Sequence, residues 1–261
     1  MVSDDLSATA ITSGLTTHFV GQRTLYYPRL TTTMEAARQE ALQGTDEGTV
    51  VIAEEQTAAR GRLKRTWLSP QGNIALSLVL YPDKDRLYSL TMVASLAVVH
   101  SIEMITGLRP QLKWPNDVLL GGKKVCGILI ESSVRAEKVD YAIVGIGINV
   151  NLDVDSYPEI RPVATTLSHE LGREVSRLCL VQCLLREIEH LYLASSAGET
   201  VYREWQSRLA TLGKAVRVIS ASGETMSEGT AESVDRDGSL VLRRADGSLT
   251  RVLAGDVSLR D

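Results

Sequence analysis

The sequence predicts an α+β fold in which helices flank a largely antiparallel sheet and a small all-β module follows. Three observations support this prediction. Apolar residues recur at helical spacing over residues 88–107. Short runs of β-branched and apolar residues, bounded by Gly, Asp or Pro, recur between residues 49 and 150. After Gly213, short β-rich runs alternate with Ser-Gly and Asp-Gly turns, as in a small meander or barrel.

The first half of the chain begins with a helix and two strands. Threonines 31–33 precede "MEAARQEAL" and can accept hydrogen bonds from the first free amides, while Met34, Ala37 and Leu42 are expected near one face. The runs "TVVIAEE" and "NIALSLVLY" have the apolar centres of strands. The strongly basic segment 54–73 is therefore expected to form a loop between strands.

The central elements are a buried helix and several antiparallel strands. The helix "YSLTMVASLAVVHSIEMITG" is expected to end at Gly107. The segments "LKWPNDVLL", "KVCGILIESSV" and "VDYAIVGIGINV" follow, with a Gly121-Gly122 turn after the first. We expect consecutive antiparallel strands here.

The last third holds two helices and the β module. Residues 176–209 are helical in pattern and are interrupted by "SSAGE". We place a domain boundary near residue 212, which gives a domain of residues 1–212, including an N-terminal extension of residues 1–20, and a second domain of residues 213–261. The similar stretches "RDGSLVL" and "ADGSLTRVL" are interpreted as two hairpin turns.

Composition excludes several classes of protein. The 261 residues are 44% hydrophobic and 23% charged, which is typical of a packed globular protein. A net charge of -4 and a pI of about 5.7 argue against bulk attraction to nucleic acid. Cys179 and Cys183 lie four apart in an apolar helical pattern and are expected to be buried rather than paired. Without a signal-like N-terminus or an unbroken apolar span, we expect a soluble cytoplasmic protein with no membrane association.

The basic loop "EEQTAARGRLKRTWLSPQGN" is the first candidate site. It gathers Arg60, Arg62, Lys64 and Arg65 around Gly61 in an acidic protein. Arginine forks suit phosphate or carboxylate, and glycine lets the backbone approach a ligand. The alternative is a solvated surface loop, but an aromatic Trp67 beside it favours a binding site.

Three further segments carry candidate residues. In "KWPND", Lys113, Asn116 and Asp117 bring a cation, an amide and a carboxylate together, although a plain polar turn is the alternative. Lys124 begins an apolar strand and can stabilise developing negative charge, or it can be a surface lysine with its stem buried; these alternatives stay open. The glycines of "VGIGINVN" are expected to let a ligand lie against the strand, with Asn149 as an amide probe.

Other patterns are absent from the sequence. "GGKK" lacks the first glycine and the Ser/Thr of a Walker A loop, and no HExxH motif or Ser-His-acid elbow is present. "VGIGIN" lacks the third glycine of a dinucleotide fingerprint. Anion handling without a nucleophile indicates phosphate chemistry by positioning and electrostatics.

These motifs together resemble the biotin protein ligases. The basic loop resembles that family's glycine- and arginine-rich loop, and "KWPND", "KKVCGILIE" and "VGIGINV" are similar to its next three blocks in the same order. "LTTTMEAA" resembles its early Ser-Thr block, and the similarity extends over about residues 20–261. The resemblance implies a mixed, largely antiparallel sheet flanked by helices, as in class II aminoacyl-tRNA synthetases and lipoate ligases, followed by a C-terminal SH3-like β-barrel.

The resemblance also implies a reaction. Biotin and ATP, with Mg2+, would form biotinyl-5'-AMP and pyrophosphate. Biotin would then pass to a lysine of a biotin carboxyl carrier protein, a domain of acetyl-CoA carboxylase or another biotin-dependent carboxylase, without a covalent enzyme intermediate. The anions that the basic loop meets would be the ATP phosphates and the biotin carboxylate.

Residue roles follow from the same resemblance. Biotin would be held by Thr32, Thr33, Met34, Gln56 and Gly127, and its carboxylate by Arg60, Gly61, Arg62 and Lys124. The nucleotide would contact Arg65, Trp67, Lys113, Asn116 and Asn149 as well as Arg60, Arg62 and Lys124, and Asp117 would lie on the metal side. Lys124, Arg60 and Arg62 are the expected catalytic residues.

The sequence departs from the family pattern within the loop. Ala59 replaces the first loop glycine, and a Cβ at a position of positive φ would cost about 1 kcal/mol. Leu63 and Lys64 stand where a basic residue and a glycine are usual. Only about twenty residues precede the first strand, so we expect no winged helix and no DNA binding. A monomer and a homodimer both stay open.

Two rival functions stay open from the residues. A lipoate or octanoate ligase of the same fold would also bind a carboxylic acid, but no Gly-rich "GGG" turn of the lipoate type is present. A biotin-sensing or nucleotide-binding module would need neither Arg60 nor Lys124.

Overall fold

The larger part of the molecule is a seven-stranded mixed sheet. The computed structural model describes residues 6–195, 199–220, 224–253 and 255–259. The strand order is β1-β2-β3-β7-β6-β5-β4; β1 and β2 are parallel and the other neighbours are antiparallel. The strands are β1 Thr24–Leu30, β2 Val50–Gln56, β3 Ile74–Leu80, β4 Gln111–Lys113, β5 Asp117–Leu120, β6 Lys123–Arg135 and β7 Lys138–Ile148.

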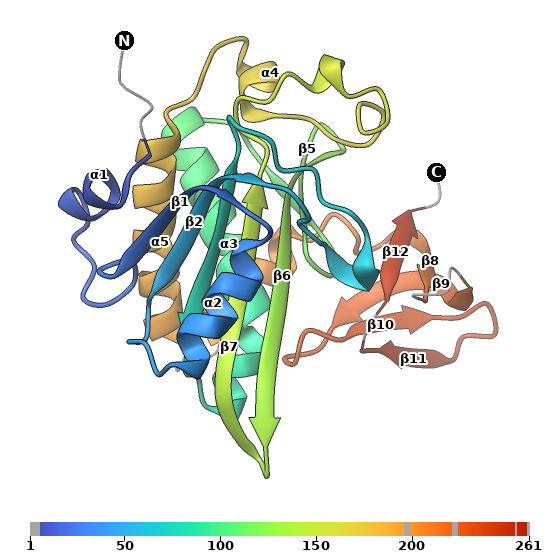
Figure 1. The fold of residues 1–261 in the computed structure, drawn as a ribbon. Coiled ribbons are helices and arrows are strands. Elements are labelled where there is room, and N and C mark those ends of the chain that lie inside the picture. The colour runs from blue at the N-terminus through green and yellow to red at the C-terminus, as the bar shows by residue number, and fades with distance from the viewer. Residues whose placement is uncertain (1–5, 196–198, 221–223, 254, 260–261) are drawn as a thin grey trace.

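Helices cover both faces of this sheet. Figure 1 shows α3 and α5 behind the sheet and α2 in front of it. The packing of α3 and α5 against the back face forms the main core, which includes Leu96, Val98 and Ile146. The helices are α1 Ala8–Ser13, α2 Thr33–Leu42, α3 Lys84–Thr106, α4 Leu167–Leu171, α5 Arg177–Ala194 and α6 Glu199–Arg208, with 3-10 turns at Arg62–Lys64 and Val154–Ser156.

Helix α3 confirms the predicted buried helix and its end. Gly107 closes it with φ 76°, a left-handed conformation that glycine adopts without strain. The helix begins before the predicted start, because the Asp83 carboxylate accepts a hydrogen bond from the Arg86 amide. By length and composition α3 is a membrane-span candidate among the described residues, but most of its apolar window is buried inside the protein.

Helix α2 packs on the opposite face through a smaller apolar cluster. Met34, Ala37 and Ala41 are buried there against the sheet. The prediction for Leu42 was wrong, because its side chain is 58% exposed. At 100° per residue, position 41 lies almost in line with position 34, whereas position 42 is turned away from the sheet.

The two cysteines of α5 differ in burial. Cys183 is buried as predicted, but Cys179 is exposed, which contradicts the prediction. Cys179 lies in the first turn of α5, where its amide donates to the side chain of Ser176, the residue that caps the start of the helix. The predicted break at "SSAGE" lies largely outside the described residues.

The chain before β1 is attached to α5. The carboxylate of Glu189 accepts hydrogen bonds of 2.7–3.0 Å from the amides of His18, Phe19 and Val20. Ile11 of α1 is fully buried. The N-terminal segment is therefore part of the packed structure.

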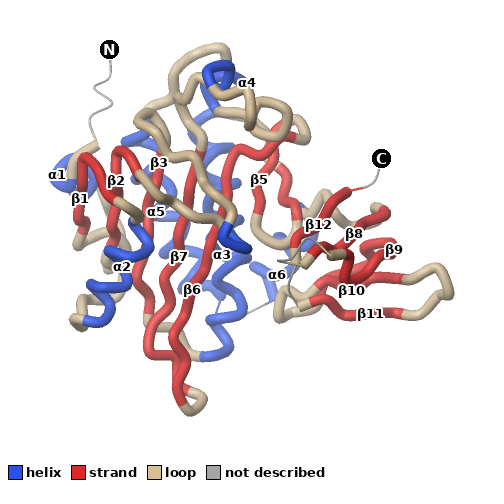
Figure 2. The backbone as a smooth tube through the Cα atoms, turned by 45° about the vertical axis from the view of Figure 1, so that its right-hand side comes forward, coloured by secondary structure: helices blue, strands red, loops and turns tan. Residues whose placement is uncertain are grey.

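The C-terminal part forms a separate five-stranded antiparallel sheet (Figure 2). Its order is β11-β10-β9-β8-β12, and the predicted Asp-Gly turns are present with Gly238 and Gly247 at φ 82°. The predicted Ser-Gly turn at 222–223 lies outside the described residues. The strands are β8 Ala215–Ile219, β9 Thr225–Val234, β10 Leu240–Arg243, β11 Leu249–Val252 and β12 Asp256–Leu259.

Trp114 joins the two sheets. It is 1% exposed, and its indole Nε1 donates to the Gly238 carbonyl at 2.8 Å. Its own amide donates to the Thr211 hydroxyl at 2.9 Å. The tryptophan of the "KWPND" motif is therefore a structural anchor for the C-terminal sheet.

Candidate functional site

A cavity of about 830 Å³ lies where the loop between β2 and β3 covers the front of the sheet. It receives residues from α2, the central strands, the loop and the C-terminal sheet. Every residue to which the family resemblance gives a ligand contact lines it: Thr32, Thr33, Met34, Gln56, Arg60, Gly61, Arg62, Arg65, Trp67, Lys113, Asn116, Asp117, Lys124, Gly127 and Asn149. The structure thus brings these residues together, while their ligand contacts stay predictions.

At one end of the cavity, α2 presents hydroxyl and amide groups. Thr32 caps the helix by accepting from the Met34 amide at 3.3 Å. The Gln56 side-chain oxygen accepts from both the amide and the hydroxyl of Thr33, at 2.8 and 3.1 Å. Ser77 in turn donates to the Thr33 hydroxyl at 2.8 Å. The network fixes donors and acceptors that suit a neutral polar ring.

Two glycines of β7 make room for side chains. A Cβ at Gly145 would lie 2.5 Å from Met34 Sδ, and a Cβ at Gly147 would lie 2.7 Å from Trp67 Nε1. Met34 and Trp67 therefore lie directly against the strand. We predicted that a ligand takes this space; in this structure, two side chains of the cavity wall occupy it.

Lys124 lies inside the cavity. Its Nζ is 2.5 Å from Asp117 Oδ1 and 5.4 Å from the centroid of the Trp67 ring. Lys123 is exposed instead and donates to the Arg161 carbonyl at 3.2 Å. The sequence left the two roles of Lys124 open, and the geometry favours the one that faces the ligand.

Asp117 is a carboxylate already paired with a lysine. Among the described residues, no group of three His, Cys, Asp or Glu side chains could hold a metal. A single carboxylate near a phosphate site nevertheless fits Mg2+, which usually takes one or two protein carboxylates and completes its shell with phosphate and water. The donor set therefore suits a metal that arrives with a nucleotide.

Asn116 and Asn149 hold the walls of the cavity. Asn116 donates to the Ile128 carbonyl at 2.5 Å, and its oxygen accepts from Arg62 at 3.3 Å. Asn149 is 4% exposed and donates to the Thr165 carbonyl at 3.1 Å. Both amides fix neighbouring segments as well as facing the cavity. Lys113 lies half-buried on β4.

The arginines of the loop have different surroundings. Arg60 is exposed, and no ion pair to it is present within the described residues. Arg62 and Arg65 lie 3.8 and 2.5 Å from Asp256 of β12. Burial lowers the pKa of Arg62, an effect that the charges of Asp256 and Asp117 oppose.

The sequence missed the part of the site that comes from the C-terminal sheet. Asp256 and Ser258 line the cavity, although almost two hundred residues separate them from the loop. No local pattern marks them, because "GDVSL" is an ordinary short strand after a turn. Their position depends on how the two sheets dock.

The strain in the loop lies at a residue other than the predicted one. Ala59 does not have positive φ, so the condition under which its Cβ was expected to cost energy is not met. Its carbonyl accepts from the Trp67 amide at 3.0 Å, and its side chain is buried. Leu63 adopts φ 55° and ψ 29° within the 3-10 turn, where a glycine would be unstrained.

Comparisons with known protein families match both parts of the chain. Residues 26–149 match the biotin/lipoate A/B protein ligase family, and residues 211–260 match the biotin protein ligase C terminal domain.

Individual proteins are similar over most of their length. A biotin–[acetyl-CoA-carboxylase] ligase of Paracoccus denitrificans is 35% identical over 225 residues, which cover 82% of this chain and 92% of the relative. The bifunctional ligase/repressor BirA of Bacillus subtilis is 35% identical over 260 residues, covering 97% and 79%. A biotin protein ligase from Aquifex aeolicus in complex with biotin and ATP superposes with a TM-score of 0.75 at 31% identity, covering 92% and 99%.

Proposed function

This chain belongs to the biotin protein ligase family, and from that premise we propose how its residues divide the work of the reaction. A biotin protein ligase activates biotin with ATP to biotinyl-5'-AMP and pyrophosphate. It then joins biotin to a lysine of a biotin carboxyl carrier domain, and relatives of this chain are named for acetyl-CoA carboxylase. The observation that carries the assignment is the convergence of Lys124, the arginine loop and the Thr–Gln network on one cavity.

Biotin is assigned to the end of the cavity beside α2. Its ureido ring is neutral and has both N–H donors and a carbonyl acceptor, which Thr32, Thr33 and Gln56 can match. The thioether of Met34 gives the ring system an apolar wall. Gly127, against which the side chains of Lys124 and Trp67 lie, is expected beside the valeryl chain.

The first step is nucleophilic attack at phosphorus. A carboxylate oxygen of biotin forms a bond to the α-phosphorus of ATP, and the bond from that phosphorus to the bridging oxygen breaks, so that pyrophosphate leaves with the electron pair. Negative charge gathers on the phosphoryl oxygens during this exchange. Lys124 can stabilise it from the Asp117 side, and Arg60 and Arg62 from the loop, in a partly dry site.

The nucleotide is assigned to the side lined by Trp67. The indole covers the adenylate, Asn149 faces the adenine, and Arg65, Lys113 and Asn116 lie toward the phosphates. Asp117 would be the protein carboxylate for an Mg2+ ion bound with ATP, and the ion would neutralise phosphate charge there.

The second step needs no enzyme nucleophile. The neutral amine of the carrier lysine attacks the acyl carbon of the adenylate, the carbon–oxygen bond to AMP breaks, and the amine proton is released. Among the described residues that line the cavity there is no cysteine, and the serine there, Ser258, belongs to the C-terminal sheet. Direct transfer from the adenylate is therefore the simplest route.

Several properties of the whole protein belong to the same proposal. We expect a cytoplasmic protein, a monomer or homodimer, with domains of residues 1–212 and 213–261. We also expect no operator binding, because the net charge is -4 and much of the basic loop faces the cavity. Fluorescence anisotropy with labelled duplex DNA tests the absence of operator binding, and sedimentation velocity tests the oligomeric state.

ATP–pyrophosphate exchange tests the activity and its acid specificity. The purified protein is assayed with biotin, lipoate and octanoate as separate acids. Exchange with biotin, and little with the other two, is expected from the Thr–Gln network, which has no role for an acid without a polar ring. Exchange with lipoate or octanoate instead would make the chain a ligase of another acid, and no exchange with any acid would leave a binding module.

A further inference from the structure

We infer that Asp256, in the C-terminal sheet, is a positioning residue for ATP that holds the arginine loop in its binding conformation. This inference rests on the proposed function of the loop. It is carried by one juxtaposition: a single carboxylate of β12 lies against both Arg62 and Arg65 at the edge of the cavity.

The contacts fix Arg62 from several directions. Its guanidinium donates to the Asn116 side-chain oxygen and to the Gly255 carbonyl, each at 3.3 Å, and lies 3.8 Å from Asp256 Oδ1. The Arg62 side chain is 22% exposed, so its charge is partly removed from water. A partly buried cation that loses its carboxylate is poorly compensated, and the segment that carries it is expected to move.

Arg65 extends the contact to the rest of the loop. Its guanidinium is 2.5 Å from Asp256 Oδ2, although its side chain is 63% exposed. An exposed pair of this kind contributes little to global stability. The effect of the Arg65–Asp256 pair is local. Together with the Arg62 contact, it holds both ends of the strained turn around Leu63 in place.

The residue before β12 also contacts Arg62. Gly255, which accepts the bond from Arg62, has φ 139°, and a Cβ there would lie 2.5 Å from Val218 Cγ1 of β8. Only a residue without a Cβ fits between Arg62 and β8. The C-terminal sheet therefore presents both a carbonyl and a carboxylate to the loop, and in Figure 1 the turn of the loop lies beside β12.

The consequence for catalysis concerns ATP more than biotin. The hydrogen bonds described for the Thr–Gln network at the biotin end do not involve Asp256. Arg65 is assigned to the nucleotide alone, and Arg62 is assigned to the phosphate as well as to the biotin carboxylate. If the loop is in its binding conformation in only a fraction of the molecules, the apparent affinity for ATP is reduced in proportion to that fraction. Asp256 itself contacts neither substrate in this scheme and acts through the two arginines.

The test is Asp256→Asn, which keeps the shape of the side chain and removes its charge. In pyrophosphate exchange we expect the KM for ATP to rise about fivefold or more, with less than a twofold change in the KM for biotin. In the ligand-free protein, trypsin should cut the loop faster, because the peptide bonds after Arg60, Arg62 and Arg65 become accessible.

Two further variants make the result specific. Asp256→Glu should restore most of the ATP KM, since it returns the carboxylate. Glu228→Gln removes one partner of an exposed pair in the same sheet, 2.8 Å from Arg217, and should change neither KM nor loop cleavage. Thermal unfolding of each variant separates local effects from a loss of fold.

Other outcomes would overturn the inference. A lower KM for ATP in Asp256→Asn would make Asp256 a competitor of phosphate rather than a support. An unchanged KM for ATP, or equal rises for ATP and biotin, would remove its positioning role. Wild-type protein without exchange activity would instead contradict the proposed function, so the two failures are distinguishable.

Discussion

At the scale of single residues, Lys124 and its neighbour form a natural comparison. Both are lysines at the start of β6, but Lys124 faces the cavity and Asp117, and Lys123 faces the surface. Adjacent residues in a strand point to opposite sides, so a shift of one position decides which lysine faces the cavity and which faces solvent.

We therefore expect Lys124→Ala to lower adenylate formation by more than ~100-fold, because a charge-stabilising donor is lost. Lys123→Ala is the matched control and should retain activity within a factor of about two. Single-turnover formation of biotinyl-5'-AMP, with circular dichroism for folding, measures both. Near wild-type turnover in a folded Lys124→Ala protein would remove Lys124 from the mechanism.

Gly145 and Gly147 permit a second comparison, since each meets a different side chain. Gly147→Ala would press on the rigid indole of Trp67, and Gly145→Ala on the flexible end of Met34. We expect Gly147→Ala to raise the KM for ATP about tenfold, and Gly145→Ala to act mainly on biotin and more weakly, since a thioether can rotate away. Separate titrations of ATP and biotin check this split; equal effects of one variant on both substrates would contradict it.

Residues within one contiguous motif could be predicted, and residues brought in by docking could not. Arg60, Arg62 and Arg65 of the loop, three residues of "KWPND", Lys124 and Asn149 were found from their types and their order along the chain, and they line the cavity. Asp256 was not found, because the C-terminal sheet meets the loop only in three dimensions. The backbone angles of the loop were also beyond reach, so the strain was expected at Ala59 and lies at Leu63.

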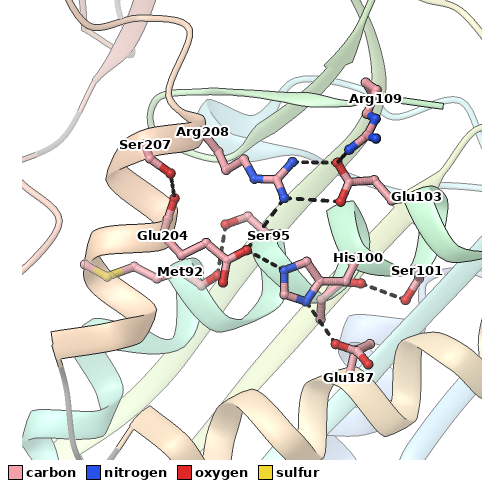
Figure 3. A network of polar contacts seen from close by, with 11 residues as sticks. Met92, Ser95, His100, Ser101, Glu103, Arg109, Glu187, Glu204, Ser207 and Arg208 are labelled. Carbon is pink, nitrogen blue, oxygen red and sulfur yellow. Dashed lines mark hydrogen bonds and ion pairs between the residues drawn. The ribbon is translucent and has the colours of Figure 1, made fainter. Parts of the chain in front are cut away.

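At the scale of elements, a polar network ties together three helices on the back of the sheet (Figure 3). His100 of α3 has Nδ1 2.9 Å from Glu187 of α5 and Nε2 2.7 Å from Glu204 of α6. Both ring nitrogens face carboxylates, so the imidazole is expected to be protonated. The surrounding charges are Arg208 on α6, which contacts Glu204 and Glu103, and Arg109, which lies 4.0 Å from Glu103.

This arrangement predicts a pH-dependent contribution to stability. Burial lowers the pKa of His100, but its hydrogen bonds to Glu204 and Glu187 outweigh burial, and the net pKa is raised above 6.5. A raised folded-state pKa stabilises the protein fully below the unfolded value and loses this effect as pH rises through the folded value. The wild type should therefore have a higher free energy of unfolding than His100→Gln. This difference should be largest below pH 6.5 and smallest in alkaline solution.

Urea unfolding across this pH range measures the difference, with His190→Gln as control. His190 is an exposed histidine on the same helix, so His190→Gln controls for the loss of a histidine as such. A constant gap between wild type and His100→Gln at all pH values would mean that His100 contributes by packing alone.

Elements were predicted better than their buried faces. Periodicity identified α2, α3, α5, α6 and the central strands, since these patterns depend on the chain itself, whereas the short helices α1 and α4 were not predicted. Leu42 and Cys179 were misassigned because exposure depends on where a helix leaves the sheet, which the sequence does not record. The structural role of the tryptophan of "KWPND" was not predicted, because its indole donates to Gly238 of the other sheet, which is distant along the chain.

At the scale of the whole molecule, the active site depends on the docking of two sheets. Trp114 fills that junction, next to the motif that supplies Asn116 and Asp117 to the cavity. The same docking brings Asp256 to the loop. A substitution at the junction is therefore expected to change substrate binding in the cavity, even though Trp114 does not line the cavity.

Trp114→Phe tests this coupling. It keeps an aromatic ring but leaves the Gly238 carbonyl without its indole donor, at a cost of about 1 kcal/mol, which lowers Tm by roughly 3 °C. We also expect the KM for ATP to rise severalfold and the loop to be cut faster by trypsin, in the same direction as Asp256→Asn. Because both changes would act through one docking event, their effects on the KM for ATP should combine to less than the product of the two. Full multiplicativity would mean that Trp114 stabilises the junction without holding Asp256 against the loop.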